Sequence, residues 1–144
     1  MSNVMKETIE DSPLFKHLDE DWHRRLIEAS EVRTASKGEV LVEEGSSAGA
    51  LFVVVRGSVR VWTEADGDTV ELKRLGPGAY FGEVSLLGAK EATATVEAAS
   101  ETVELVAVDG GVIAELVESD DKVRGMLEGV TLARARDTIG KVLE

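Results

Sequence analysis

The feature that most constrains the fold of this chain is a run of short apolar segments separated by glycines between residues 31 and 108. The glycines recur at intervals of 6 to 12 residues, at Gly38, Gly45, Gly57, Gly67, Gly76 and Gly82. Runs rich in Val, Leu and Thr accompany them, at residues 40–42, 51–55, 59–62, 69–72, 93–96 and 103–108. Many short strands at regular spacing are typical of a sandwich or a barrel. Residues 31–108 are therefore predicted to form a β-barrel.

Two segments in this region carry more specific signals. Asp66-Gly67 lies between two strand-like runs, and an Asp-Gly pair tolerates the positive φ angles of a tight reversal, which predicts a hairpin. Leu51 to Val55 are apolar without alternation. This strand is expected to be buried on both faces.

The two ends of the chain have the apolar spacing of helices. The N-terminal part contains Ser12-Pro13 as a helix start and Asp19 as a second N-cap. A further helix is predicted after Asp109-Gly110, followed by a long C-terminal helix. The predicted segments are 1–30 (helical), 31–108 (barrel) and 109–144 (helical), which form one structural domain over residues 12–140.

The apolar stripe of the C-terminal helix needs a surface to cover it. Val123, Leu127 and Val130 recur at steps of three and four residues, and the stripe continues to Val142 on a rotated face. Packing on the barrel and packing against a second subunit both satisfy this need. We expect a homodimer or a protein partner bound through this helix.

Composition argues against several classes of function. The formal net charge of −12 disfavours nucleic-acid binding, because affinity for phosphate backbones comes from clustered Lys and Arg. Residues 31–121 alone sum to −11, with seven basic against eighteen acidic side chains. Cysteine is absent, which removes disulfides and thiolate chemistry. No apolar stretch approaches the roughly 18 residues that a bilayer requires, and the polar N-terminus does not resemble a signal peptide. We expect a cytoplasmic protein without membrane contact.

Residues 76–96, GPGAYFGEVSLLGAKEATATV, combine features of an anion-binding turn. Gly82 allows the backbone to approach a ligand closely, and Glu83 stands at the start of a short apolar helical turn. A carboxylate at that place suits a sugar hydroxyl, and the free N–H groups of a helix start suit a phosphate.

This segment resembles the phosphate-binding cassette of the cyclic-nucleotide-binding domain family. Pieces of the early barrel of that family are also similar, at residues 44–45, 49–54, 56–61 and 75–78. The resemblance extends over residues 12–140 or so. It implies a mainly β fold with flanking helices: a double-stranded β-helix, or jelly-roll barrel, with N-terminal helices and a long C-terminal helix.

By this resemblance the ligand-binding residues of the cassette are Gly82, Glu83, Val84, Ser85, Leu86, Ala92 and Thr93. Gly82 and the amides of Ser85 and Leu86 would face the phosphate. Glu83 would accept a hydrogen bond from the ribose 2′-hydroxyl. Two structural alternatives stay open: Glu83 as the cap of the short helix, and Thr93 as an ordinary strand residue.

The family's phosphate-pairing arginine stands nine residues after the cassette glutamate, and this chain has Ala92 there. An arginine–phosphate pair is strong because its hydrogen bonds are charge-assisted and bidentate. Losing one partner of a buried pair costs about 2–5 kcal/mol, so binding is expected to weaken roughly thirtyfold to several thousandfold. Lys90 is a candidate substitute cation, although it lacks the planar guanidinium. Arg56, Arg60 and an arginine of the C-terminal helix are further candidates.

We interpret the chain as a non-enzymatic regulatory module that binds cAMP or cGMP weakly or not at all and acts through protein contacts or dimerisation. The alternative is a genuine cyclic-nucleotide sensor in which another cation replaces the missing arginine. A third hypothesis, the sensor half of a transcription factor, is disfavoured because the chain ends at Glu144, before a DNA-binding domain. The sequence has no Ser/His/Asp set, metal-binding cluster or P-loop, so catalysis, a metal and a cofactor are not expected.

Overall fold

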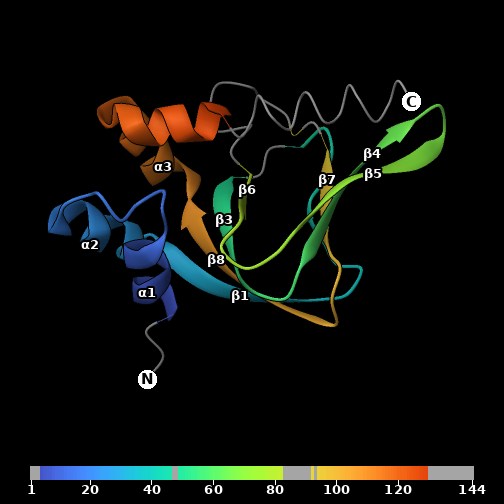
Figure 1. The fold of residues 1–144 in the computed structure, drawn as a ribbon, viewed down its shortest axis with the longest axis horizontal. Helices are drawn as coiled ribbons and strands as arrows, with labels where there is room; N and C mark the ends of the chain where they lie inside the picture. The colour runs from blue at the N-terminus through green and yellow to red at the C-terminus, as the bar shows by residue number, and fades with distance from the viewer. Residues whose placement is uncertain (1–3, 47–48, 83–91, 93, 130–144) are drawn as a thin grey trace.

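The computed structural model describes residues 4–46, 49–82, 92 and 94–129. Within them, two antiparallel sheets of four strands have the orders β1-β8-β3-β6 and β2-β7-β4-β5. The elements are α1 (Val4–Asp11), α2 (Glu20–Glu28), β1 (Ser30–Ser36), β2 (Val40–Val42), β3 (Ala50–Arg56), β4 (Val59–Ala65), β5 (Asp68–Leu75), β6 (Tyr80–Phe81), β7 (Thr95–Ala98), β8 (Thr102–Asp109) and α3 (Gly110–Ser119). The three helices lie to one side of the strands, and the β4–β5 hairpin extends on the other (Figure 1). The prediction of a mainly β barrel with flanking helices is confirmed.

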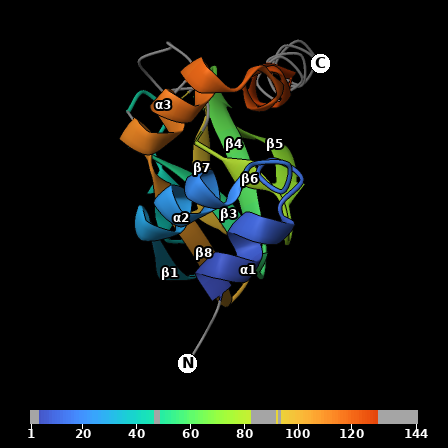
Figure 2. The ribbon, with the colours of Figure 1, turned by 90° about the vertical axis from the view of Figure 1, so that its left-hand side faces the viewer.

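The hydrophobic core has two parts that share β3 and β8. The barrel interior is filled by side chains from both sheets, among them Phe52, Val61 and Leu105. A second cluster lies between the helices and the outer face of the β1-β8-β3-β6 sheet, where Leu51 and Val106 meet the apolar faces of α2 and α3. Figure 2 shows α1 and α2 in front of this sheet. Because both faces of β3 are covered, Ala50 through Val54 are all buried, and Val55, the last residue of the predicted run, is partly buried.

The hairpin between β4 and β5 forms where the Asp-Gly pair predicted it. Asp66 has a φ of 52° and Gly67 a φ of 83°, so both central residues adopt the left-handed conformation of the tight turn. Ala65 and Asp68 pair directly across it. Along β4 the side chains alternate between the buried interior and the outer surface, which leaves Arg60 and Trp62 on the outer face.

The N-terminal helices differ from the prediction in one respect. Ser12-Pro13 was expected to start a helix, and this prediction was wrong: α1 ends at Asp11, and the segment after Pro13 forms turns. Pro13 disfavours helical backbone in the residue before it and cannot donate to the preceding turn, so it terminates α1. The predicted cap at Asp19 is confirmed, because its carboxylate accepts a hydrogen bond from the Trp22 amide at 2.9 Å.

Two strands were not anticipated. β1 is an edge strand whose side chains are mostly exposed, and β6 contains only two residues. Neither strand has a strong apolar pattern in its sequence. An edge strand and a two-residue strand each bury few side chains. The predicted helix after Asp109 is confirmed, with the Asp109 carboxylate accepting from the Gly111 amide at 3.0 Å. Residues 121–129 are helical as well.

Candidate functional site

The start of the predicted cassette is anchored by two stacked aromatic rings. Phe81 of β6 pairs with Phe52 of β3, and their ring centroids lie 5.0 Å apart. Both side chains are buried in the barrel interior. Gly82 follows directly with a φ of 95°, a left-handed conformation that favours glycine and turns the chain out of β6. The cassette therefore begins at a fixed point at one end of the barrel.

Ala92, the residue that the resemblance predicts at the position of the phosphate-pairing arginine, is tied to the turn after β2. Its N–H donates to the Ser46 carbonyl at 2.7 Å, and its carbonyl accepts from the Gly45 N–H at 2.8 Å. The side chain is partly buried against the apolar barrel interior, and so is that of Ala94. At this position the barrel interior thus receives a methyl group and no charge. The other predicted ligand-binding residues and the candidate cation lie outside the described residues, namely Glu83, Val84, Ser85, Leu86, Lys90 and Thr93.

The turn that holds Ala92 is itself pinned to the second sheet. The Glu44 N–H donates to Thr95 Oγ1 at 3.0 Å, and Thr63 Oγ1 donates to the Glu44 carboxylate at 2.7 Å. Thr63 and Thr95 are buried polar residues, so these bonds also satisfy their hydroxyl groups. The sequence indicated Glu44-Gly45 only as a glycine turn of the early barrel, and its bonds to Thr63 and Thr95 appear only in three dimensions.

Two arginines proposed from the sequence as substitutes lie away from the cassette end of the barrel interior: Arg60 is ion-paired on the outer face, and Arg56 is exposed at the end of β3. Arg60 lies on the outer face of the barrel, where its guanidinium contacts Glu97 at 2.6 Å and Glu71 at 3.9 Å. Arg56 ends β3, several residues beyond the Phe52–Phe81 pair that marks the cassette end of the barrel. Neither side chain points into the barrel interior at the cassette end.

Arg33 of β1 does face the barrel interior, which the sequence analysis missed. Its guanidinium carbon lies 5.5 Å from the centroid of the Phe52 ring, the ring that stacks on Phe81 beside Gly82. Ala35 shares this face of the strand and is buried in the barrel interior. Arg33 also forms an ion pair with Glu31 at 2.7 Å, and half of its side chain is exposed. Arg33 and Ala35 are two residues apart, which is the spacing of side chains on one face of a strand. This signal was present in the sequence, but no strand was predicted at β1.

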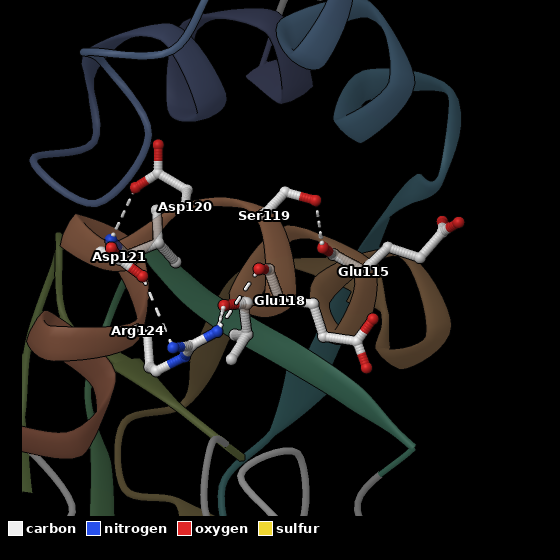
Figure 3. A network of polar contacts seen from close by, with 8 residues as sticks. Glu115, Glu118, Ser119, Asp120, Asp121 and Arg124 are labelled. Carbon is white, nitrogen blue, oxygen red and sulfur yellow. Dashed lines mark hydrogen bonds and ion pairs between the residues drawn. The ribbon is translucent and has the colours of Figure 1, made fainter.

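The connection between α3 and the helix at residues 121–129 carries a polar network (Figure 3). Arg124 donates to the Val117 carbonyl at 2.7 Å and so covers the C-terminal end of α3. Asp120 caps the next helix, accepting from the Val123 amide at 2.9 Å, and lies 3.1 Å from His17 Nε2. Burial raises the pKa of Asp120, but the bonds from Val123 and His17 outweigh it and hold that pKa below the ordinary value of 3.8.

The structure is a jelly-roll barrel with a glycine turn that leaves β6 at one end. The sequence that forms this barrel matches a known family. The family described as Cyclic nucleotide-binding domain matches residues 32–120, more than half of the chain. The chain belongs to this family. The predicted resemblance is confirmed at this level.

Curated relatives of the domain include much longer proteins. The chain is 30% identical to cGMP-dependent protein kinase 2 of Mus musculus over 126 residues, which are 86% of this chain and 16% of the kinase. Among solved structures, the regulatory domain of Toxoplasma gondii PKA in complex with cAMP has 27% identity and a TM-score of 0.68, over 75% of this chain and 41% of that one.

The same fold also occurs in a solved chain of similar length. A structure from Geobacter metallireducens, described as a cyclic nucleotide-binding protein, has a TM-score of 0.69 and covers 95% of this chain and 97% of its own. At 23% identity this likeness shows the fold alone.

Two kinds of feature are absent from the described residues. None of their helices has the length and apolar character needed to span a membrane. No group of three or more His, Asp or Glu side chains among them is arranged to hold a metal ion.

Proposed function

We propose that this cyclic nucleotide-binding domain is a non-catalytic regulatory module that binds cAMP or cGMP weakly and acts mainly through protein contacts, in the cytoplasm. The observation that supports weak binding is Ala92, an uncharged side chain packed against the apolar barrel interior at the arginine position. A cyclic phosphate there loses a bidentate, charge-assisted partner. The contacts include a homodimer or partner interface through the C-terminal helix. Val123 and Leu127 are already buried in the helix-covered core cluster of the domain itself, so this interface would use the remainder of the apolar stripe, from Val130 to Val142, which lies outside the described residues.

Calorimetric titration of the unaltered protein and of Ala92→Arg with cAMP and cGMP tests the weak-binding proposal. The substitution restores the guanidinium at the right spacing, so affinity should rise about thirtyfold to several thousandfold. Thr69→Arg is the matched control, because it adds the same charge at an exposed position of β5. Its affinity should equal that of the unaltered protein. Micromolar binding by the unaltered protein would contradict weak binding.

The contact part of the proposal has a separate test. Light scattering of the purified protein should give the mass of a dimer, or a partner should be recovered by pull-down. A strict monomer that recovers no partner would remove the support for this part.

A second candidate function, a genuine cyclic-nucleotide sensor, is favoured by the position of Arg33. Its guanidinium faces the barrel interior above the Phe52 ring, at the cassette end. If Arg33 binds the phosphate, the phosphate competes with Glu31 for the guanidinium. Breaking this ion pair lowers the affinity relative to that of an arginine without such a partner. Arg33→Gln then abolishes the binding heat of the unaltered protein, whereas Arg60→Gln on the outer face leaves it unchanged. Equal binding by Arg33→Gln and the unaltered protein rejects this candidate.

A further inference from the structure

A pocket of about 590 Å³ opens on the outer face of the β2-β7-β4-β5 sheet, away from the barrel interior. Its walls include the turn after β2, with Glu43 and Glu44, and the exposed end of β4, with Trp62 and Glu64. The neighbouring side chains Val61 and Val96 point to the opposite face, into the core. The pocket therefore opens on the side of β4 opposite Val61, and it shares the turn at Glu44 and Gly45 with Ala92.

The charge of this pocket is one-sided. Among the described residues that line it, three carry carboxylates and none is Lys or Arg. Glu44 is held in place before any ligand arrives, by the Thr63 hydroxyl on its carboxylate and by Thr95 on its backbone N–H. A carboxylate that is already ordered loses little conformational freedom on binding, which favours affinity for a cation.

Trp62 adds an aromatic surface that already accepts a cation within the protein. The guanidinium carbon of Arg60 lies 5.7 Å from the centroid of its ring, and Arg60 itself is neutralised by Glu97. Aromatic faces beside carboxylates attract guanidinium and ammonium groups through the ring quadrupole as well as through charge.

The indole N–H of Trp62 favours a peptide as the ligand over a cation alone. Nε1 is buried and has no acceptor among the described residues. A buried donor without a partner is costly. A ligand whose carbonyl oxygen reaches Nε1, once the side chains over this edge of the indole move aside, therefore gains a favourable hydrogen bond. A peptide backbone supplies that oxygen next to a basic side chain.

We propose that this pocket binds an arginine side chain, with its adjoining peptide group, presented by a partner protein. This proposal rests on the proposed function in protein contacts and not on nucleotide binding, because it specifies which group of the partner protein the domain contacts. Arginine suits the pocket better than lysine because a guanidinium can stack on an indole while it pairs with two carboxylates. The strongly acidic body of the domain, −11 over residues 31–121, draws basic segments toward it.

The test follows the Trp62 indole signal by ¹⁵N–¹H NMR, with Trp22→Phe to assign it, since the chain has two tryptophans. The probe is a capped pentapeptide with two arginines between glycines, and its citrulline counterpart, which keeps the shape and removes the charge, is the control peptide. The arginine peptide should shift the Trp62 signal saturably, and the citrulline peptide should not. Glu44→Gln with Glu64→Gln should weaken binding about three- to tenfold, as expected for partly exposed charge pairs.

A matched control variant distinguishes binding in the pocket from general electrostatic attraction of the basic peptide to the acidic protein. Glu101→Gln with Glu118→Gln removes the same charge at exposed positions outside the pocket. The proposal requires this pair to leave peptide affinity within twofold of the unaltered protein. Equal weakening by both pairs, equal shifts from the citrulline peptide, or no saturable shift at all overturns it. None of these outcomes depends on cAMP or cGMP, so the nucleotide titrations stand apart from this test.

Discussion

Gly57, in the turn from β3 to β4, is a residue at which the backbone leaves little room for a side chain. Its φ is +81°, and a Cβ there would lie 2.5 Å from the Thr102 carbonyl oxygen and 2.6 Å from Ser100 Oγ. The left-handed conformation alone costs a non-glycine residue about 1–2 kcal/mol. We predict that Gly57→Ala lowers the free energy of unfolding by about 2–4 kcal/mol, because the clash with backbone adds to that strain. Urea denaturation measures it.

Gly78→Ala provides the comparison for this prediction. Gly78 has a similar φ of +90°, but nothing lies within 4 Å of a Cβ built on it. This substitution should cost only the conformational part, about 1–2 kcal/mol. If both variants lose the same stability, close approach at Gly57 is not what excludes a side chain.

At the scale of elements, the joint between α3 and the helix at 121–129 depends on Asp120. Its pKa is lower in the folded state than the ordinary 3.8. A carboxyl with a depressed folded pKa contributes stability that is present above its unfolded pKa and is lost as pH falls through the folded value. The contribution of the Asp120 charge should therefore be lost progressively below about pH 4.

Asp120→Asn isolates this charge, because asparagine also caps helices well and keeps an acceptor for the Val123 amide. We predict that the variant is less stable than the unaltered protein at pH 7 by under about 1 kcal/mol, as for a partly exposed pair. The difference should shrink as pH falls from 4 toward 2. Urea denaturation at several pH values measures it, and a difference that grows in acid contradicts the assignment.

At the scale of the whole molecule, the two parts of the core are expected to unfold together. β3 contributes Leu51 to the helix-covered cluster and Phe52 to the barrel interior, so neither part keeps its packing without the other. Leu116 of α3 is fully buried in the helix-covered cluster. Leu116→Ala should cost about 2–5 kcal/mol and leave a single cooperative transition.

The two tryptophans report on the two parts separately. Trp22 packs against the helix-covered cluster, and Trp62 lies on the outer face of β4. With Trp22→Phe and Trp62→Phe as single-tryptophan backgrounds, both urea midpoints should coincide before and after Leu116→Ala. A lower midpoint from Trp22 alone would mean that the helices detach from a barrel that stays folded.

Much of the fold follows from local patterns that need no tertiary information. Glycine spacing and apolar runs located β2, β3, β4, β5 and β8, and the Asp-Gly pair located the hairpin. The caps at Asp19 and Asp109 were predictable because a capping side chain bonds an amide within three residues of it. The assignment of Ala92 to the arginine position also came from spacing and stays a prediction, whereas the family match over residues 32–120 supports the fold.

Tertiary structure alone decided which distant groups meet. The bond from Glu44 to Thr95 spans 51 residues, and the contact of His17 with Asp120 spans 103. Such pairs depend on how the sheets close and where the helices pack, and sequence periodicity records only the inward or outward face of each residue. For this reason the inward position of Arg33 and the pocket between Glu44 and Trp62 became visible only in the folded chain.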